Sequence, residues 1–114
     1  MGHPLSGDAY EIKISVVGRK SGNTITIPVW FAVEEQKLWL LPVLGSDTQW
    51  YRNVLQNPSI RIDAGGVSAE LRAKPITEAK AVKSVVEKFR EKHGAKDVKK
   101  YYSKFDVAVV VELG

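Results

Sequence analysis

A short basic turn carries the clearest candidate chemistry in this sequence. Residues 18–22 read Gly-Arg-Lys-Ser-Gly and stand between two runs of alternating apolar residues. The glycines permit backbone conformations in which successive N–H groups converge on an anion. Arg19 adds a planar fork of donors, Lys20 a point charge and Ser21 a hydroxyl, and a phosphate ester accepts hydrogen bonds from all three. The motif predicts either a phosphate cradle or a solvated turn whose charges protect a sheet edge.

A second group of residues could bind a flat ring. Trp50, Tyr51, Arg52 and Asn53 are consecutive, and they place two aromatics, a cation and an amide at the start of a short predicted helix. Trp30 lies on the strand that leaves the basic turn. A phosphorylated aromatic ligand needs a cationic pocket for its tail and flat apolar walls for its ring. The alternative is that the tryptophans are ordinary core residues.

Other catalytic chemistries lack their residues. The chain has no cysteine and two histidines, His3 and His93. His93 falls in the last turn of a predicted helix, where an imidazole interacts favourably with the helix dipole. No cluster of histidine and carboxylate residues suits a metal, and no serine lies in the sharp turn of a hydrolase nucleophile. An enzyme with this sequence would therefore depend on a bound cofactor, and a metal is not expected.

The length and composition predict one domain over residues 1–114, with residues 1–10 unstructured. We recognise neither an export signal nor a stretch apolar enough to cross a membrane, so a cytoplasmic location without membrane contact is expected. The formal net charge of +4 favours anionic partners such as nucleotides or phosphorylated cofactors.

Alternating apolar residues predict that most of the chain forms antiparallel strands. Six strands are expected, at 11–17, 24–33, 37–43, 59–64, 67–74 and 107–113. Ser46 or Asp47 is expected to cap a short helix over 48–56. Thr77 is expected to cap the longest helix, which Gly94 ends, and a shorter helix is expected over 97–102. The pattern indicates a mainly β protein with α-helices (α+β), a six-stranded antiparallel split β-barrel with one main helix in its C-terminal half.

The two strands predicted after the basic turn are apolar on both faces. In the second of them, Leu38 and Leu40 face one way, whereas Trp39 and Leu41 face the other. One face is expected to fill the barrel, and the other to meet a helix, a second subunit or an aromatic ligand. Pro28 removes a backbone donor from the first of these strands, which predicts an edge position or a bulge.

These motifs together resemble the deazaflavin-dependent nitroreductase and quinone reductase family, which shares the split β-barrel flavin-binding fold of pyridoxamine-phosphate oxidase-like proteins. The resemblance rests on "GRKSG", on "PVW" six residues later and on "WYRNVLQNP", and it covers about 11–113. It implies an F-420-type deazaflavin coenzyme, or FMN, and transfer of hydride to a small electron acceptor such as a quinone, a nitro compound or an activated alkene. It also implies a homodimer with the cofactor near the interface.

The resemblance further implies roles for individual residues. The cofactor phosphate would bind Arg19, Lys20, Ser21 and Gly22. The ring would lie along Pro28, Val29 and Trp30, and a loop with Trp50, Tyr51 and Asn53 would close over it. The family's serine- and glycine-rich stretch would add Gly45 and Ser46. Catalytic or substrate-facing hydroxyl groups would come from Tyr51, Tyr101 or Tyr102.

Two departures from the family pattern keep other functions open. Ile25 stands where many members have a basic residue, and residues 43–47 are shorter than the family's stretch and carry Asp47. One alternative is a split barrel that binds a ligand without catalysis or holds no cofactor. The other is an OB-like module that binds single-stranded nucleic acid on Trp30 and Trp39. Nucleic acid is the less favoured partner, because the cations gather in the C-terminal helices.

Overall fold

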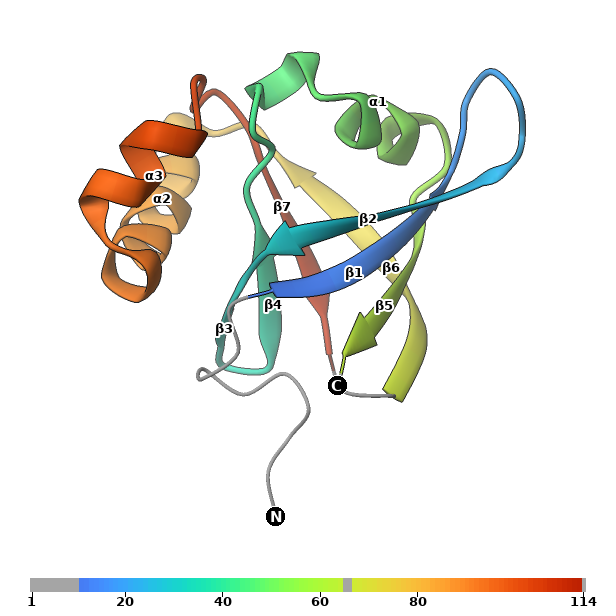
Figure 1. The fold of residues 1–114 in the computed structure, drawn as a ribbon, viewed down its shortest axis with the longest axis horizontal. Coiled ribbons are helices and arrows are strands. Elements are labelled where there is room, and N and C mark those ends of the chain that lie inside the picture. The colour runs from blue at the N-terminus through green and yellow to red at the C-terminus, as the bar shows by residue number, and fades with distance from the viewer. Residues whose placement is uncertain (1–10, 65–66, 114) are drawn as a thin grey trace.

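The sheet of this protein has seven strands rather than the six predicted. The structure, a computed structural model, describes residues 11–64 and 67–113, so the expectation for residues 1–10 lies outside the described residues. The strands are β1 (Glu11–Val17), β2 (Thr24–Trp30), β3 (Ala32–Glu34), β4 (Lys37–Leu40), β5 (Ser59–Ala64), β6 (Val67–Ile76) and β7 (Ala108–Glu112). They form one antiparallel sheet in the order β2-β1-β5-β6-β7-β4-β3, curled into a half-barrel (Figure 1).

The additional strand arises from a corner at Phe31, inside the predicted strand 24–33. The first part, β2, pairs with β1, and the second part, β3, pairs with β4. Phe31 is fully buried in the half-barrel between them. The apolar alternation continues through the corner, so it does not reveal that the two parts have different partners. Pro28 lies in β2, which is a terminal strand of the described sheet, as its missing N–H predicts.

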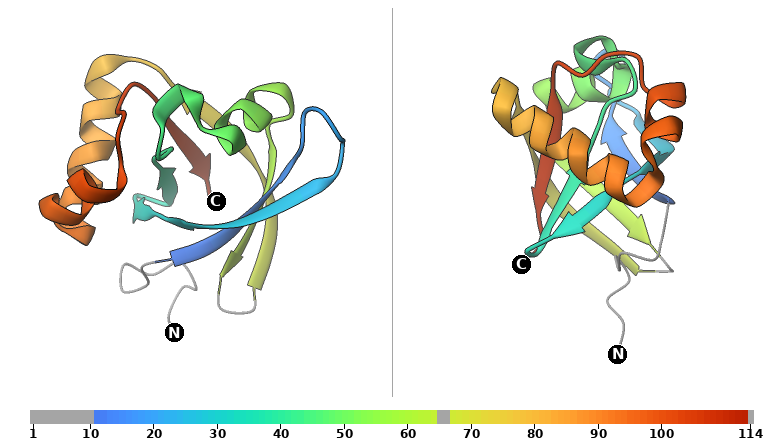
Figure 2. Two further views of the ribbon diagram at one scale, coloured as in Figure 1. Left: turned by 45° about the horizontal axis from the view of Figure 1, so that its top comes forward. Right: turned by 90° about the vertical axis from the view of Figure 1, so that its left-hand side faces the viewer.

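Two apolar cores lie on opposite faces of the sheet. The inner core fills the half-barrel and includes Leu38 and Leu40, both fully buried. The outer core lies between the sheet and two helices, α2 (Ala79–His93) and α3 (Ala95–Tyr101), which lie side by side on this face (Figure 2). Trp39 and Leu41 pack in this outer core. The predicted alternation of Leu38 and Leu40 with Trp39 and Leu41 is therefore confirmed along β4 and the residue that follows it. Helices of the same chain cover the second apolar face, so that face does not require a second subunit.

Helix α1 (Gln49–Gln56) lies across one end of the half-barrel, after the 3₁₀ turn η1 (Gly45–Asp47) (Figure 1). Its N-cap is Thr48, and the prediction that Ser46 or Asp47 caps it is wrong. Both predicted caps are engaged elsewhere, Ser46 with Asp106 and Asp47 with Arg52 and Lys104. The Thr48 hydroxyl accepts the N–H of Leu44 and thereby closes the turn before the helix.

Helix α2 begins after Glu78, so the predicted cap Thr77 is also wrong. The predicted apolar stripe of α2 is confirmed: Val82, Val85, Val86 and Phe89 are buried in the outer core. Gly94 ends the helix with φ of 92°, a conformation that glycine adopts at little cost. Within the described ranges, no helix is long and apolar enough to cross a membrane.

Candidate functional site

The basic turn is held together by its own backbone. Gly18 N–H donates to Asn23 O and Gly22 N–H donates to Gly18 O, both at 2.8 Å. Asn23 N–H donates to the Ser21 hydroxyl at 3.2 Å. The turn therefore uses two of its glycine amides internally, whereas the side chains of Lys20 and Ser21 remain exposed at its tip. An anion at this tip would meet an ammonium group and a hydroxyl.

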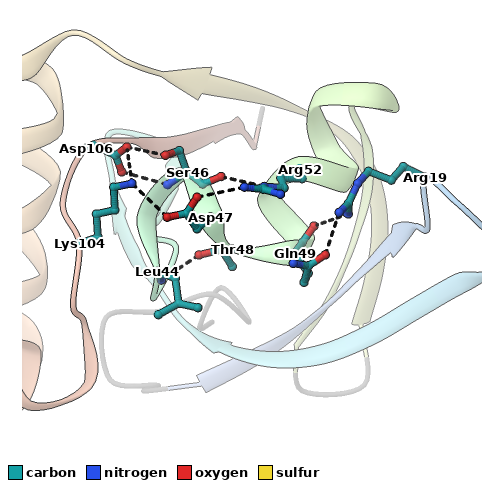
Figure 3. A network of polar contacts seen from close by, with 9 residues as sticks. All are labelled: Arg19, Leu44, Ser46, Asp47, Thr48, Gln49, Arg52, Lys104 and Asp106. Carbon is teal, nitrogen blue, oxygen red and sulfur yellow. Dashed lines mark hydrogen bonds and ion pairs between the residues drawn. The ribbon is translucent and has the colours of Figure 1, made fainter.

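Arg19 joins the turn to α1. Its guanidinium donates to Gln49 Oε1 at 2.8 Å (Figure 3). The guanidinium also donates to Asn53 Oδ1 at 2.8 Å, and the backbone N–H of Arg19 donates to the same oxygen at 3.1 Å. Gln49 and Asn53 are four residues apart, so they lie on the same face of the helix. Both partners are neutral amides. The contacts thus orient the Arg19 guanidinium without neutralising its positive charge.

A pocket of about 340 Å³ lies beside α1. It gathers residues from β2, from the segment after β4, from α1 and from the end of α3. Its lining residues are Pro28, Val29, Trp30, Leu41, Val43, Trp50, Tyr101 and Tyr102. Six of these eight are residues that the sequence analysis associated with a ring-binding or substrate-facing role. Leu41 and Val43 were not singled out, although the apolar alternation placed Leu41 on the same face as Trp39.

The other predicted site residues lie outside this pocket. Tyr51 is 3% exposed and packs in the inner core, although it follows Trp50 directly. Burial, and to a lesser degree the Asp106 carboxylate, raises the pKa of Tyr51. Asn53 is buried against Arg19. The structure therefore separates the aromatic pocket from the residues that anchor the basic turn.

Ser46 belongs to a polar clamp, which we define as Ser46, Asp47, Arg52, Lys104 and Asp106 (Figure 3). Gly45 directly precedes this clamp in η1. Ser46 donates to Asp106 from its backbone N–H at 2.9 Å and from its hydroxyl at 2.6 Å. Lys104 Nζ lies 3.1 Å from Asp47 Oδ2 and 3.7 Å from Asp106 Oδ2. Arg52 donates to Asp47 Oδ1 at 3.0 Å.

The clamp joins two segments that flank the aromatic pocket. One contains Val43 and the other follows Tyr102, and Ser103 N–H also donates to Val43 O at 3.0 Å. A hydrogen bond from Lys104 is the main cause that lowers the pKa of Asp47, and the hydrogen bond from Ser46 lowers that of Asp106. A single exposed ion pair contributes little to stability, so we expect the clamp to hold the two segments together mainly because several contacts are linked.

The pocket wall opposite α1 is aromatic. Tyr101 is about half exposed, and Tyr102 is buried at 6% exposure. Burial raises the pKa of Tyr102, so its phenol stays protonated across the physiological range. The ring of Trp30 lies edge-to-face with Tyr101 at a centroid distance of 5.5 Å. Such a wall suits a flat conjugated ligand and offers a neutral hydroxyl donor beside it.

His93 has a different environment from the one predicted. His93 lies in the last turn of α2, as expected. Its side chain is 9% exposed, however, and it stacks on Trp30, a contact that the expected interaction with the helix dipole does not include. Its Nε2 lies 3.2 Å from Phe31 O. Burial is the main cause that lowers the pKa of His93. The sequence placed this residue on a helix and gave no signal that the helix would dock on β2.

Because of the neighbouring Lys92, we expect the free energy of unfolding to increase in alkaline solution. Its ammonium group donates to Phe31 O at 2.8 Å, and burial lowers the pKa of Lys92 from 10.5 to about 8. Between these values the unfolded chain binds more protons than the folded chain, so the free energy of unfolding rises with pH from about 8 to about 10.5. Urea unfolding of the wild type and Lys92→Met at about pH 7 and about pH 9.5 measures this difference. Equal changes in both proteins would contradict it.

Neither tryptophan needed for a nucleic-acid platform is free on the sheet. Trp30 and Trp39 both pack against the outer core under the helices. The Lys88 ammonium lies over the Trp39 ring at 5.5 Å from its centroid and also pairs with Glu34 at 3.1 Å. In the part of the chain that the structure describes, no three histidine or carboxylate groups gather in a way that could hold a metal.

Comparisons with known proteins agree with this architecture. A solved structure described as a domain-swapped dimer superposes with a TM-score of 0.71 at 20% identity, covering 92% of this chain and 81% of the other. The F420-H2 dependent reductase FDR-A superposes with a TM-score of 0.69 at 19% identity, covering 90% and 93%. The haem storage protein HutZ from Vibrio cholerae superposes with a TM-score of 0.71 at 12% identity, covering 94% and 83%.

At these identities the structural likeness establishes the fold alone, and the HutZ match shows that this fold also serves haem proteins. No curated protein matches the sequence significantly. The sequence model described as F420H(2)-dependent quinone reductase, however, matches residues 1–114. The split half-barrel, the basic turn and the aromatic pocket therefore belong to a protein of the F420H(2)-dependent quinone reductase family.

Proposed function

We propose that this protein is a deazaflavin-dependent reductase that reduces a flat electron acceptor such as a quinone, a nitro compound or an activated alkene. The observation that carries the proposal is the arrangement around α1. One face of this helix holds Arg19 of the basic turn, and Trp50 of the same helix lines the aromatic pocket. A ligand with an anionic tail and a conjugated ring has this shape and charge.

The residues present fit such a coenzyme. Lys20 and Ser21 are exposed at the tip of the turn, and the charge of Arg19 is oriented by neutral amides. These groups would hold a phosphate through charge-assisted hydrogen bonds. Trp30 and Trp50 would contact the ring. When bound, the deazaflavin supplies the hydride, and the protein supplies position and exclusion of water.

We propose that Tyr102 contacts the electron acceptor. Its hydroxyl remains protonated because burial raises the pKa of Tyr102, so it can donate a hydrogen bond to an acceptor oxygen on which negative charge develops. Tyr101, which is more exposed, lies at the mouth of the same pocket. We do not assign a catalytic role to Tyr51, because its side chain packs in the inner core.

Titration with F420 and with FMN tests the proposal. We expect the protein to quench the fluorescence of F420 and, with reduced F420, to reduce menadione. Binding of FMN alone would assign the protein to a flavin-dependent branch. Binding of F420 without reduction of any acceptor would favour a non-catalytic carrier. If neither cofactor binds, the reductase proposal fails, and salt-dependent binding of single-stranded DNA would then support the nucleic-acid alternative.

We also propose that the protein forms a homodimer. The domain-swapped dimer among its structural neighbours supports this assembly, and β2 has one strand partner in the described sheet, which leaves an edge available for contact. Light scattering of the purified protein measures its mass directly. A mass of one chain at all concentrations would contradict the dimer without affecting the proposed chemistry.

A further inference from the structure

One wall of the aromatic pocket is supported from behind by a buried imidazole. The rings of Trp30 and His93 stack with centroids 4.4 Å apart and an angle of 17° between their planes. Trp30 lines the pocket, whereas His93 does not. Because His93 is buried on α2 and Trp30 ends β2, this stack is the point at which the helix fixes the orientation of a pocket residue.

The imidazole is itself held in place by the backbone next to Trp30. His93 Nε2 lies 3.2 Å from the carbonyl oxygen of Phe31, and Lys92 Nζ donates to the same oxygen at 2.8 Å. Two consecutive residues of α2 thus bind the corner between β2 and β3. The Lys92 ammonium also lies 3.5 Å from the centroid of the Phe31 ring. The end of α2 therefore fixes both the backbone and the indole plane at this corner.

The remaining neighbours leave Trp30 few alternative orientations. Tyr101 lies edge-on to the indole at 5.5 Å, and Tyr102 is tilted against it at 5.9 Å. Phe89 packs against both His93 and Tyr102, at 5.6 Å and 5.9 Å. Aromatic pairs at these distances favour specific relative geometries beyond the burial of their surface. Removing the imidazole would open space into which the indole can rotate.

We propose that His93 is a positioning residue, which holds the Trp30 indole in the orientation that a flat conjugated ring needs in order to stack in the pocket. The inference rests on the proposed function, since it names the chemistry that the pocket selects. The ring can belong to the deazaflavin or to the acceptor, and both would bind through the same aromatic contact. A preorganised wall increases affinity because the ligand does not have to order it.

The stack involves the neutral imidazole. Burial lowers the pKa of His93, the Lys92 ammonium lowers it further, and the Phe31 carbonyl and the Asp97 carboxylate oppose this change. Near neutral pH the pair is therefore a contact between two uncharged aromatic rings. Phenylalanine can replace this contact, and the Phe31 carbonyl keeps the hydrogen bond from Lys92.

Three variants separate the ring of His93 from its hydrogen bond. His93→Phe keeps a ring and loses the Nε2 group, His93→Gln keeps a donor at that position and loses the ring, and His93→Ala loses both. Glu91→Ala, an exposed change on the same helix, is the control. We expect His93→Gln and His93→Ala to weaken binding of a flat ligand about 3- to 10-fold, and His93→Phe to bind nearly as the wild type does.

Calorimetric titration with F420 and, separately, with menadione shows which ring uses this wall. The KM for menadione should rise in His93→Gln with little change in kcat, because Trp30 contributes binding rather than chemistry. In a Trp30→Ala background the effect of His93→Gln should disappear. Wild-type affinity in all three variants, or rescue by glutamine and not by phenylalanine, would overturn the assignment.

Near-ultraviolet circular dichroism provides a test that needs no ligand. The contribution of Trp30, obtained by subtracting the spectrum of Trp30→Phe, should persist in His93→Phe and largely vanish in His93→Gln. If the wild type binds neither F420 nor menadione, the proposed function fails, and this spectrum still decides whether His93 holds the indole. An unchanged Trp30 signal in His93→Gln would reject the positioning role even where binding is observed.

Discussion

Replacing Arg19 and Lys20 together with alanine is expected to weaken the binding of F420 at least about 100-fold. Each residue can form a charge-assisted hydrogen bond to a phosphate, and such bonds contribute about 1.5 to 3 kcal/mol each. Losing two of them corresponds to about two or more orders of magnitude in Kd. Quenching of F420 fluorescence measures this change. Unchanged affinity would show that the phosphate does not bind at the basic turn.

The matched control is Arg72→Ala with Lys74→Ala, which removes the same two residue types from exposed positions on β6. This control should leave F420 affinity within about twofold of wild type, because the two charges act only at long range through screening salt. Gln49→Ala separates orientation from charge, since it removes the 2.8 Å bond from Arg19 to the Gln49 side chain and keeps the guanidinium. We expect an intermediate loss, and a loss as large as that of the double variant would assign the main effect to α1.

Gly45→Ala is expected to lower the free energy of unfolding by about 3 kcal/mol. Gly45 has φ of 57°, and a non-glycine residue there costs about 1 to 2 kcal/mol. A Cβ at this position would overlap Asp106 Oδ1 and lie 2.9 Å from Lys104 Cγ, so crowding adds about 1 to 3 kcal/mol. Urea unfolding measures the sum.

Gly22→Ala is the control for this prediction. Gly22 has φ of 75°, and no atom lies within 4 Å of the position of its Cβ, so only the backbone cost of about 1 to 2 kcal/mol remains. Removing Asp106 should relieve part of the crowding, and Gly45→Ala should therefore cost about 1 kcal/mol less in an Asp106→Ala background. Equal losses in the free energy of unfolding for Gly45→Ala and Gly22→Ala would mean that Lys104 and Asp106 move aside at no measurable cost.

The structure also changes the interpretation of Gly45 and Ser46. The resemblance implied that they contact the cofactor, and that role remains a proposal. In the structure, Gly45 allows the segment of Lys104 and Asp106 to approach closely, and Ser46 donates both of its groups to Asp106. Asp106 is separated from Ser46 by 60 residues, and no local pattern in the sequence indicates this pairing.

The sequence alone predicted the features that depend on a few consecutive residues. Alternation identified the two faces of β4, and Gly94 marked the end of α2. The missing donor of Pro28 indicated an edge position or a bulge, and β2 is a terminal strand of the described sheet. Of the residues for which the family resemblance implied a role, Pro28, Val29, Trp30, Trp50, Tyr101 and Tyr102 line one pocket, and their roles there are a proposal. The alternation, Pro28 and Gly94 are local signals, because periodicity, capping and backbone freedom are properties of short segments.

Only the tertiary structure decided which distant segments meet. It divided one predicted strand at Phe31 and buried Tyr51 in the inner core. It also stacked His93 against Trp30 and bound the side chain of Arg19 to α1. Such pairings join residues as distant in sequence as Trp30 and His93, and they follow from how the sheet curls and which apolar surface the helices cover. The sequence by itself thus determined the chemistry available to this protein, whereas packing decided which of those groups share a site.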